Sequence, residues 1–135
     1  MSEPKEDSSG RRKHGEALIY VVDDEPMLLE LASVILEPLG YSVATFRSPE
    51  TALRAFELAE PGPALVITDY AMHAMTGLTL ASACRRIRPK QKVLMISGSV
   101  GPDILHDAPV RPDRFLAKPY HAKQLIEAVE ATLAA

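Results

Sequence analysis

Acidic, hydroxyl and basic side chains follow the short apolar runs of this sequence. The residues in question are Asp23, Asp24, Asp69, Ser97 and Lys118. Carboxylates that share one edge of a sheet repel each other by roughly several kcal/mol per close pair at an effective dielectric of about 20, unless a cation neutralises them. Carboxylate oxygens, a carbonyl and water suit Mg²⁺, which is usually bound by one or two carboxylates together with phosphate oxygens. The residue types therefore predict a Mg²⁺ site at which Ser97 and Lys118 face a phosphate.

Short apolar runs and amphipathic segments alternate along the chain. The first run is continuous, which is typical of a strand buried on both faces of a parallel sheet. The expected strands cover residues 17–22, 43–46, 64–67, 93–96 and 115–117. Apolar residues at helical spacing predict helices that begin at Pro26 and Pro49, a third over 80–87, and a last one after Lys118-Pro119. The alternation predicts an α/β fold with a doubly wound, five-stranded parallel sheet and helices on both faces.

The stretch from 98 to 113 has the weakest pattern. Its prolines, Pro102, Pro109 and Pro112, remove backbone donors and disfavour helical geometry in the residues before them. We therefore expect a short or irregular fourth helix that spans at most 102–107.

The polar residues should converge, because ligands of an open parallel sheet bind outside the carboxyl ends of its strands. Each residue alone has an ordinary explanation. The acidic residues before Pro26 could complement a helix dipole, worth about 0.3–1 kcal/mol, while Ser97 could cap a helix and Lys118 could be solvated. Four strand ends with compatible groups at one edge favour a functional site.

The composition is that of one soluble domain. The 135 residues are 47% hydrophobic and 24% charged, with a net charge of −3 that gives no indication of nucleic-acid binding.

Residues 1–15 are expected to be a disordered, solvated tail, and 16–135 the folded domain. The lone Cys84 cannot form an internal disulfide and is expected in the core. The start lacks a signal-like apolar region and no run approaches the roughly 18 residues of a membrane span, so we expect a cytoplasmic protein without membrane contact.

The sequence resembles the receiver domains of two-component response regulators over residues 17 to about 133. An acidic pair, an acceptor motif, a switch hydroxyl, a switch aromatic and a Lys-Pro dipeptide carry the resemblance. The matching residues are Asp23-Asp24, Asp69 with Met72, Met75 and Gly77, Ser97, Phe115, and Lys118-Pro119.

The resemblance implies the roles of these residues. Asp69 would accept a phosphoryl group, and Asp24, Asp69 and the backbone carbonyl of Ala71 would bind Mg²⁺, with Asp23 acting mainly through water. Lys118 and Ser97 would contact the phosphoryl group, and Ser97 with Phe115 would form the switch. The strand order would be 2-1-3-4-5. The donor would be a phosphohistidine of a sensor histidine kinase or a histidine phosphotransfer protein, and an output partner would bind the switched face.

One departure from the family pattern is His73, which stands where a proline is usual and leaves the loop after Asp69 less rigid. A lone histidine gives little reason to expect a metal ligand. Met72 and Met75 are expected to pack, since thioethers do not suit Mg²⁺.

The leading hypothesis is a single-domain response regulator that catalyses only its own phosphorylation and dephosphorylation, because the last expected helix ends at the final residue. A receiver fragment of a hybrid histidine kinase is an alternative. A phosphohydrolase of the haloacid dehalogenase type would place a second Asp where Ala71 stands. A flavodoxin-like cofactor binder would need a Ser/Thr/Gly-rich phosphate loop after the first strand. The acidic residues 23–25 stand there instead and would repel a phosphate.

Overall fold

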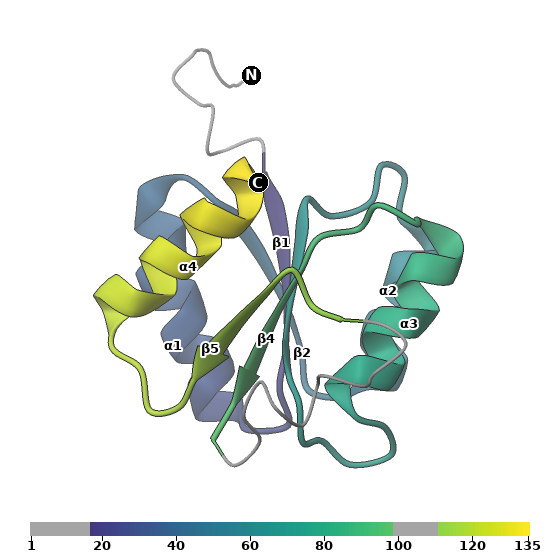
Figure 1. The fold of residues 1–135 in the computed structure, drawn as a ribbon, viewed down its shortest axis with the longest axis horizontal. Helices are drawn as coiled ribbons and strands as arrows, with labels where there is room; N and C mark the ends of the chain where they lie inside the picture. Colours follow the sequence, from purple (N-terminus) through teal and green to yellow (C-terminus); the bar gives the residue numbers. More distant parts are fainter. Residues whose placement is uncertain (1–16, 99–110) are drawn as a thin grey trace.

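The fold is a five-stranded parallel sheet between two layers of helices (Figure 1). The computed structural model describes residues 17–98 and 111–135. The strands lie in the order β2-β1-β3-β4-β5. Their bounds are Leu18–Val22 for β1, Ser42–Phe46 for β2, Leu65–Asp69 for β3, Val93–Ser97 for β4 and Arg114–Ala117 for β5. This order and the all-parallel pairing confirm the predicted fold class.

Within residues 17–98 and 111–135, two helices cover each face of the sheet. The helices are α1 (Pro26–Leu36), α2 (Pro49–Leu58), α3 (Gly77–Ile87) and α4 (Ala122–Ala134), with a short 3₁₀ helix, η2 (Glu37–Leu39), after α1. In Figure 1, α1 and α4 lie on one side of the sheet and α2 and α3 on the other. The short helix expected at 102–107 lies outside the described residues.

Each face of the sheet has its own apolar core. Leu29, Leu36 and Leu125 from α1 and α4 pack on one face, and Phe56 and Leu80 from α2 and α3 pack on the other. Strands β3 and β4 are buried along their whole length, which explains their continuous apolar sequences. The edge strands β2 and β5 are partly exposed.

The helix ends follow the capping signals of the sequence. Ser48 caps α2 by accepting a hydrogen bond from the backbone of Thr51 at 3.2 Å, and Pro49 occupies the first turn. Pro26 likewise occupies the first turn of α1. Gly40 adopts a left-handed φ of 101° after η2, a conformation that glycine tolerates.

The expected strand bounds are correct to within one or two residues. The largest difference concerns β3, which was expected to end at residue 67 and extends to Asp69, because Asp69 still pairs with Ile96 of β4. Cys84 is buried as expected, and burial raises the pKa of its thiol to about 11. No helix within the described residues is long and apolar enough to cross a membrane.

Candidate functional site

Three carboxylates meet at the carboxyl edge of the sheet. Asp23 and Asp24 follow β1, and Asp69 ends the adjacent central strand β3. One oxygen of each carboxylate lies within 4.8 Å of an oxygen of the other two. Asp23 and Asp69 are buried, and Asp24 is half-buried. The three predicted acidic residues therefore form a single cluster.

Lys118 reaches this cluster from the end of β5. Its Nζ lies 3.4 Å from Oδ2 of Asp69 and 3.7 Å from Oδ2 of Asp23. The backbone N–H of Lys118 donates to the carbonyl of Ser97 at 2.8 Å, which links the ends of β4 and β5. One ammonium group thus faces two buried carboxylates.

Backbone hydrogen bonds hold the carboxylates in place. The N–H of Asp23 donates to the carbonyl of Phe46, and the Oδ1 of Asp23 accepts from the N–H of Glu25 at 2.9 Å. At the end of β3, the N–H of Tyr70 donates to the carbonyl of Ile96 at 2.8 Å. Because both acidic strand ends are tied to neighbouring strands, their positions are set by the sheet itself.

Gly77 begins α3 against the acceptor strand. Its N–H donates to the carbonyl of Tyr70 at 2.8 Å. A Cβ at position 77 would overlap the backbone oxygen of Asp69 and lie 2.6 Å from the sulfur of Met95. The glycine of the acceptor motif is therefore required by close approach of the helix to the strand.

Burial and mutual repulsion raise the pKa values of two of the carboxyl groups. Desolvation is the main cause for both Asp23 and Asp69, and the neighbouring carboxylates raise each pKa further. Lys118 acts in the opposite direction on both groups. The net upward shift means that the folded protein stabilises the charged forms of these carboxyl groups less well than water does, which is typical of functional sites.

The remaining predicted residues lie at this edge or on the strands and loop that lead to it. Ser97 ends β4 and is buried, and Phe115 of β5 is partly buried against the core cluster that contains Met95. Ala71 lies in the exposed loop two residues after Asp69. Met72 and Met75 are partly buried and pack against the core cluster of α2 and α3, as expected for packing residues.

Tyr120 is a site neighbour that the sequence analysis did not identify. It lies two residues after Lys118 and is partly buried. Burial is the main cause that raises the pKa of its phenol, and the charges of Asp23 and Asp69 raise it further. Its position after the Lys-Pro dipeptide was the available signal.

His73 contacts the cluster from the loop between β3 and α3. Its Nε2 lies 3.5 Å from Oδ2 of Asp24, and its side chain is 94% exposed. The next residue, Ala74, has a left-handed φ of 75°. The histidine is therefore an immediate neighbour of one of the three carboxylates.

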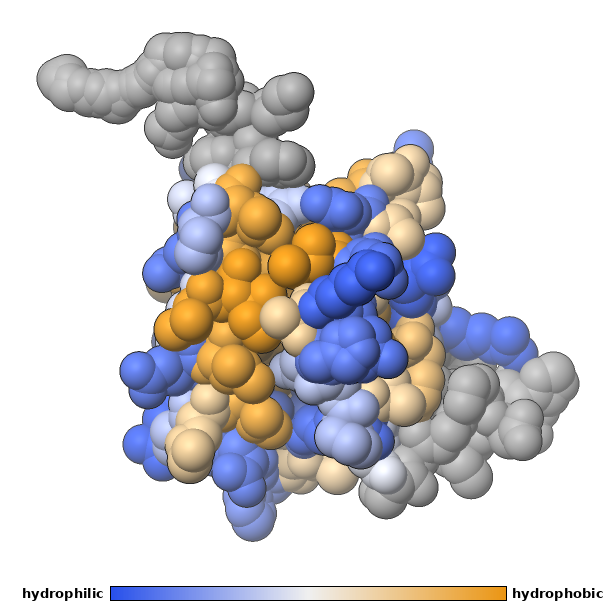
Figure 2. Space-filling model, turned by 90° about the vertical axis from the view of Figure 1, so that its left-hand side faces the viewer, coloured by the Kyte–Doolittle hydropathy of each residue, from blue (hydrophilic) through white to orange (hydrophobic). Residues whose placement is uncertain are grey.

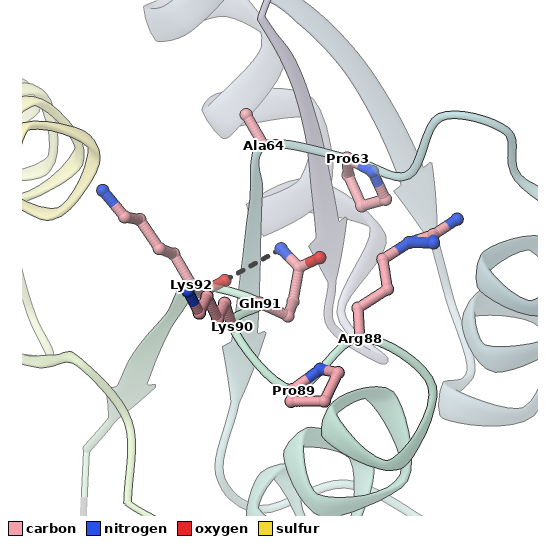
Figure 3. A pocket seen from close by; sticks show the side chains of 7 residues that line it. All are labelled: Pro63, Ala64, Arg88, Pro89, Lys90, Gln91 and Lys92. Atoms are coloured by element: carbon pink, nitrogen blue, oxygen red, sulfur yellow. Dashed lines mark hydrogen bonds between the residues drawn. The ribbon is translucent and has the colours of Figure 1, made fainter.

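A pocket lies at the opposite, amino edge of the sheet (Figure 3). It has a volume of about 530 Å³, and its lining residues are Pro63, Ala64, Arg88, Pro89, Lys90, Gln91 and Lys92. Two of its three cationic side chains are already bound to carbonyls. Arg88 donates to the carbonyl of Ala59, and Lys92 donates to the carbonyls of Leu133 and Ala135 at 2.8 and 2.6 Å. This pocket contains none of the predicted site residues.

The fold and the site together define a doubly wound α/β protein with an acidic, lysine-bearing centre at the carboxyl edge of its sheet. The family model of the response regulator receiver domain matches residues 19–130. The chain therefore belongs to the receiver domain family, whose members are signalling domains of two-component systems.

Curated relatives agree with this assignment. The response regulator receiver protein CpdR of Brucella abortus is 31% identical over 122 residues, which cover 87% of this chain and 97% of that protein. The transcriptional regulatory protein GlrR of Escherichia coli is 32% identical over 122 residues, which cover 89% of this chain. The match spans 27% of the length of GlrR.

Solved structures show the same fold. A response regulator receiver domain protein from Clostridium thermocellum superposes with a TM-score of 0.79 at 29% identity, covering 87% of this chain and 94% of the other. The chemotaxis protein CheY4 of Vibrio cholerae gives a TM-score of 0.79 at 24% identity and covers 86% of this chain. At that lower identity the second comparison supports the fold alone.

Proposed function

We propose that this domain accepts a phosphoryl group on Asp69 from a phosphohistidine of a sensor histidine kinase or a histidine phosphotransfer protein. The observation that carries the proposal is the setting of the Asp69 carboxylate. It lies at the end of the central strand with Lys118 Nζ at 3.4 Å and two other carboxylates close enough to share a cation. The receiver unit would comprise residues 16–135, which include the family match.

The transfer needs a nucleophile, alignment and charge stabilisation. A carboxylate oxygen of Asp69 would form the new bond to phosphorus while the bond between phosphorus and the donor's ring nitrogen breaks. The electron pair of the broken bond stays on the imidazole. The Lys118 ammonium would stabilise the charge on the phosphoryl oxygens, and water would later release inorganic phosphate and restore the Asp69 carboxylate.

The donor set fits a hard divalent cation. Three carboxylates with oxygens within 4.8 Å of one another supply more negative charge than Lys118 neutralises, and oxygen ligands are those that Mg²⁺ prefers. Asp24, Asp69 and the carbonyl of Ala71 would hold the ion, with Asp23 acting through water. When bound, the ion would neutralise charge on the transferring phosphoryl oxygens.

Phosphorylation would act on the ends of β4 and β5. An aspartyl phosphate adds about −1.5 to −2 charge and new acceptor oxygens. The Ser97 hydroxyl would move toward it, and Phe115 would turn inward into the space that is released. The changed surface would then bind an output partner in the cytoplasm.

An apolar stripe on α1 supports a protein as the phosphodonor. Met27, Leu31 and Val34 occupy one face of the helix and are 79%, 42% and 62% exposed. Figure 2 shows apolar side chains gathered over the side of the molecule that carries α1 and α4. Because α1 begins two residues after Asp24, a donor that docks on this stripe also reaches the acidic cluster.

Incubation with acetyl phosphate and intact-mass measurement test the acceptor. With Mg²⁺ the wild type should gain the mass of one phosphoryl group, and without Mg²⁺ it should not. Asp69→Asn should gain none. Full labelling of that variant would show that another residue is the acceptor.

The docking stripe is tested by comparing two donors. Val34→Glu should slow transfer from a purified, phosphorylated histidine phosphotransfer protein and leave labelling by acetyl phosphate unchanged. Leu58→Glu is the matched control, because Leu58 is 80% exposed on α2, on the other side of the sheet. Equal rates of phosphotransfer to both variants and the wild type would show that α1 is not the docking surface.

A further inference from the structure

Strand β5 is a short edge strand that leads directly to Lys118. It has four residues, and its neighbour in the sheet is β4 (Figure 1). Successive side chains of a strand point to opposite faces, so a shift of β5 by one residue would turn each of its side chains to the other face. The position of the Lys118 ammonium group therefore depends on the register of this strand.

The side chain of Asp113 extends the pairing of β4 and β5 at the amino end of β5. The N–H of Asp113 donates to the carbonyl of Val93 at 2.9 Å. In return, the N–H of Val93 donates to Oδ2 of Asp113 at 2.7 Å. A side-chain oxygen thus does what a strand carbonyl does further along the ladder. The two hydrogen bonds fix the start of β5 against the start of β4.

Arg85 holds Asp113 in this position from α3. Its Nη2 donates to the same oxygen of Asp113, Oδ2, at 2.8 Å. Its Nε donates to the carbonyl of Gln91 at 3.0 Å, and its Nη1 donates to the carbonyl of Arg111. The planar guanidinium therefore joins α3 to the residues that precede β4 and β5. We call Arg85, Asp113 and Val93 the β5 clamp.

The geometry of the clamp matters more than its charge. The side chains of Arg85 and Asp113 are 21% and 37% exposed, so water screens their charges, and ion pairs of this kind contribute little to stability. Three nitrogens of one guanidinium nevertheless have an acceptor each, and one carboxylate oxygen accepts two hydrogen bonds. Such an arrangement constrains direction, which is what the alignment of a neighbouring strand needs.

We propose that the β5 clamp positions the Lys118 ammonium group against Asp69. The inference rests on the proposed function. Arg85 and Asp113 are positioning residues, because they act through β5 from its amino end. At the carboxyl end, the N–H of Lys118 donates to the carbonyl of Ser97 at 2.8 Å, so both ends of the strand are tied to β4. Lys118 Nζ lies 3.4 Å from Asp69 Oδ2, and a displacement of about 1 Å can cost about 100-fold in rate.

Rates of labelling by acetyl phosphate at saturating Mg²⁺ test this inference. Arg85→Met and Asp113→Ala should label about tenfold or more slowly than the wild type, because the lysine is misplaced. Asp113→Asn should label at nearly the wild-type rate, since its amide oxygen can accept both hydrogen bonds that Oδ2 accepts. The matched control is Arg86→Met at the next, exposed residue of α3, and its rate should equal that of the wild type.

A double-mutant cycle separates positioning from a general loss of stability. In a Lys118→Ala background, the further change Asp113→Ala should leave the labelling rate unchanged, because the group that the clamp positions is absent. A change that only destabilised the fold would slow labelling by the same factor in both backgrounds. The Mg²⁺ affinity of Arg85→Met should equal that of the wild type, since the three carboxylates follow β1 and β3.

The side-chain NMR signals of Lys118 report its position without any labelling. They should shift in Arg85→Met and stay in place in Arg86→Met. Unshifted signals, wild-type rates in folded Arg85→Met and Asp113→Ala, or an equal loss of rate with and without Lys118 would overturn the role of the clamp and leave phosphorylation of Asp69 intact. Absence of labelling in the wild type would overturn the proposed function, whereas the shift of the Lys118 signals would still support the clamp.

Discussion

The two edges of the sheet carry opposite charges, and these charges differ in how completely they are paired. At the carboxyl edge, Asp23 and Asp69 are buried and share one ammonium group, that of Lys118. At the amino edge, Arg88 and Lys92 are each bound to backbone carbonyls of other elements.

The carbonyls at the amino edge belong to helix ends. Ala59 follows the last residue of α2, and Leu133 and Ala135 lie at the end of α4. Cations near the end of a helix satisfy its last carbonyls and interact favourably with its dipole. Arg88 also lies over the Phe56 ring at 5.2 Å. The cations of this edge therefore stabilise the fold, whereas the carboxylates of the other edge retain unbalanced charge that a ligand can neutralise.

Replacing one lysine at each edge is the strongest test of the difference between a functional carboxyl edge and a stabilising amino edge. Lys118→Ala should slow phosphorylation by acetyl phosphate by about 100-fold or more, a common effect of losing one charge-stabilising donor. Lys92→Ala should phosphorylate at the wild-type rate and melt at a lower temperature, because two carbonyls at the end of α4 lose their donor. A slow Lys92→Ala variant that is fully folded would contradict the division of roles.

Removal of Arg88 should have the largest effect on stability. Arg88→Ala should lower the free energy of unfolding by about 2 kcal/mol, since it removes a hydrogen bond and a cation–π contact. Urea denaturation measures this change. Lys90→Ala, at an exposed position of the same pocket, is the control and should stay within about 0.5 kcal/mol.

Mg²⁺ should stabilise the folded protein through the carboxyl edge alone. At ten times its Kd, a ligand that binds only the folded state adds about 1.4 kcal/mol. The melting temperature of the wild type should therefore rise with Mg²⁺, and that of Asp24→Asn should not. A rise of equal size in both proteins would indicate that Mg²⁺ acts elsewhere.

Neutralisation of the acceptor should stabilise the metal-free protein slightly. Burial raises the pKa of Asp69 in the folded state, so the folded protein binds more protons than the unfolded chain between the ordinary value of 3.8 and the raised value. Stability is therefore lost as the pH rises through this window. Asp69→Asn removes the charge and should raise the melting temperature at neutral pH by about 4 °C, the shift that roughly 1 kcal/mol gives in a domain of this size.

The same linkage fixes the pH dependence of that gain. At a pH below the ordinary value both the folded and the unfolded protein have a protonated Asp69, and the advantage of Asp69→Asn should disappear. Melting curves at neutral and acidic pH measure it. An advantage that grows toward acidic pH would contradict the upward shift.

Much of the fold could be predicted from the sequence, because apolar runs and helix caps are local signals. Ser48-Pro49 and Pro26 mark helix starts, and the buried central strands have continuous apolar sequences. The strand order came from the family resemblance, since periodicity does not specify which strands are neighbours. The order in the structure agrees with it.

The residues of the site could be predicted from the sequence, but the contacts between their side chains could not. Residues at strand ends reach one edge whatever the details of packing, which explains why Asp23, Asp69 and Lys118 meet. His73 contacts Asp24 from a loop that contains the left-handed Ala74, and a left-handed alanine has no sequence signature. The partners of Arg88 and Lys92 lie 29 to 43 residues away and are backbone atoms, which carry no side-chain signal.

The close approach of Gly77 to the acceptor strand has an evolutionary consequence. Asparagine can replace Asp69 with almost no change of volume. The fold can therefore persist when the phosphate-accepting carboxylate is lost. Any side chain at position 77 would instead force α3 away from the Asp69 backbone and Met95. Selection on this position therefore acts through excluded space, and a descendant of this protein that lost signalling altogether would still be expected to retain the glycine.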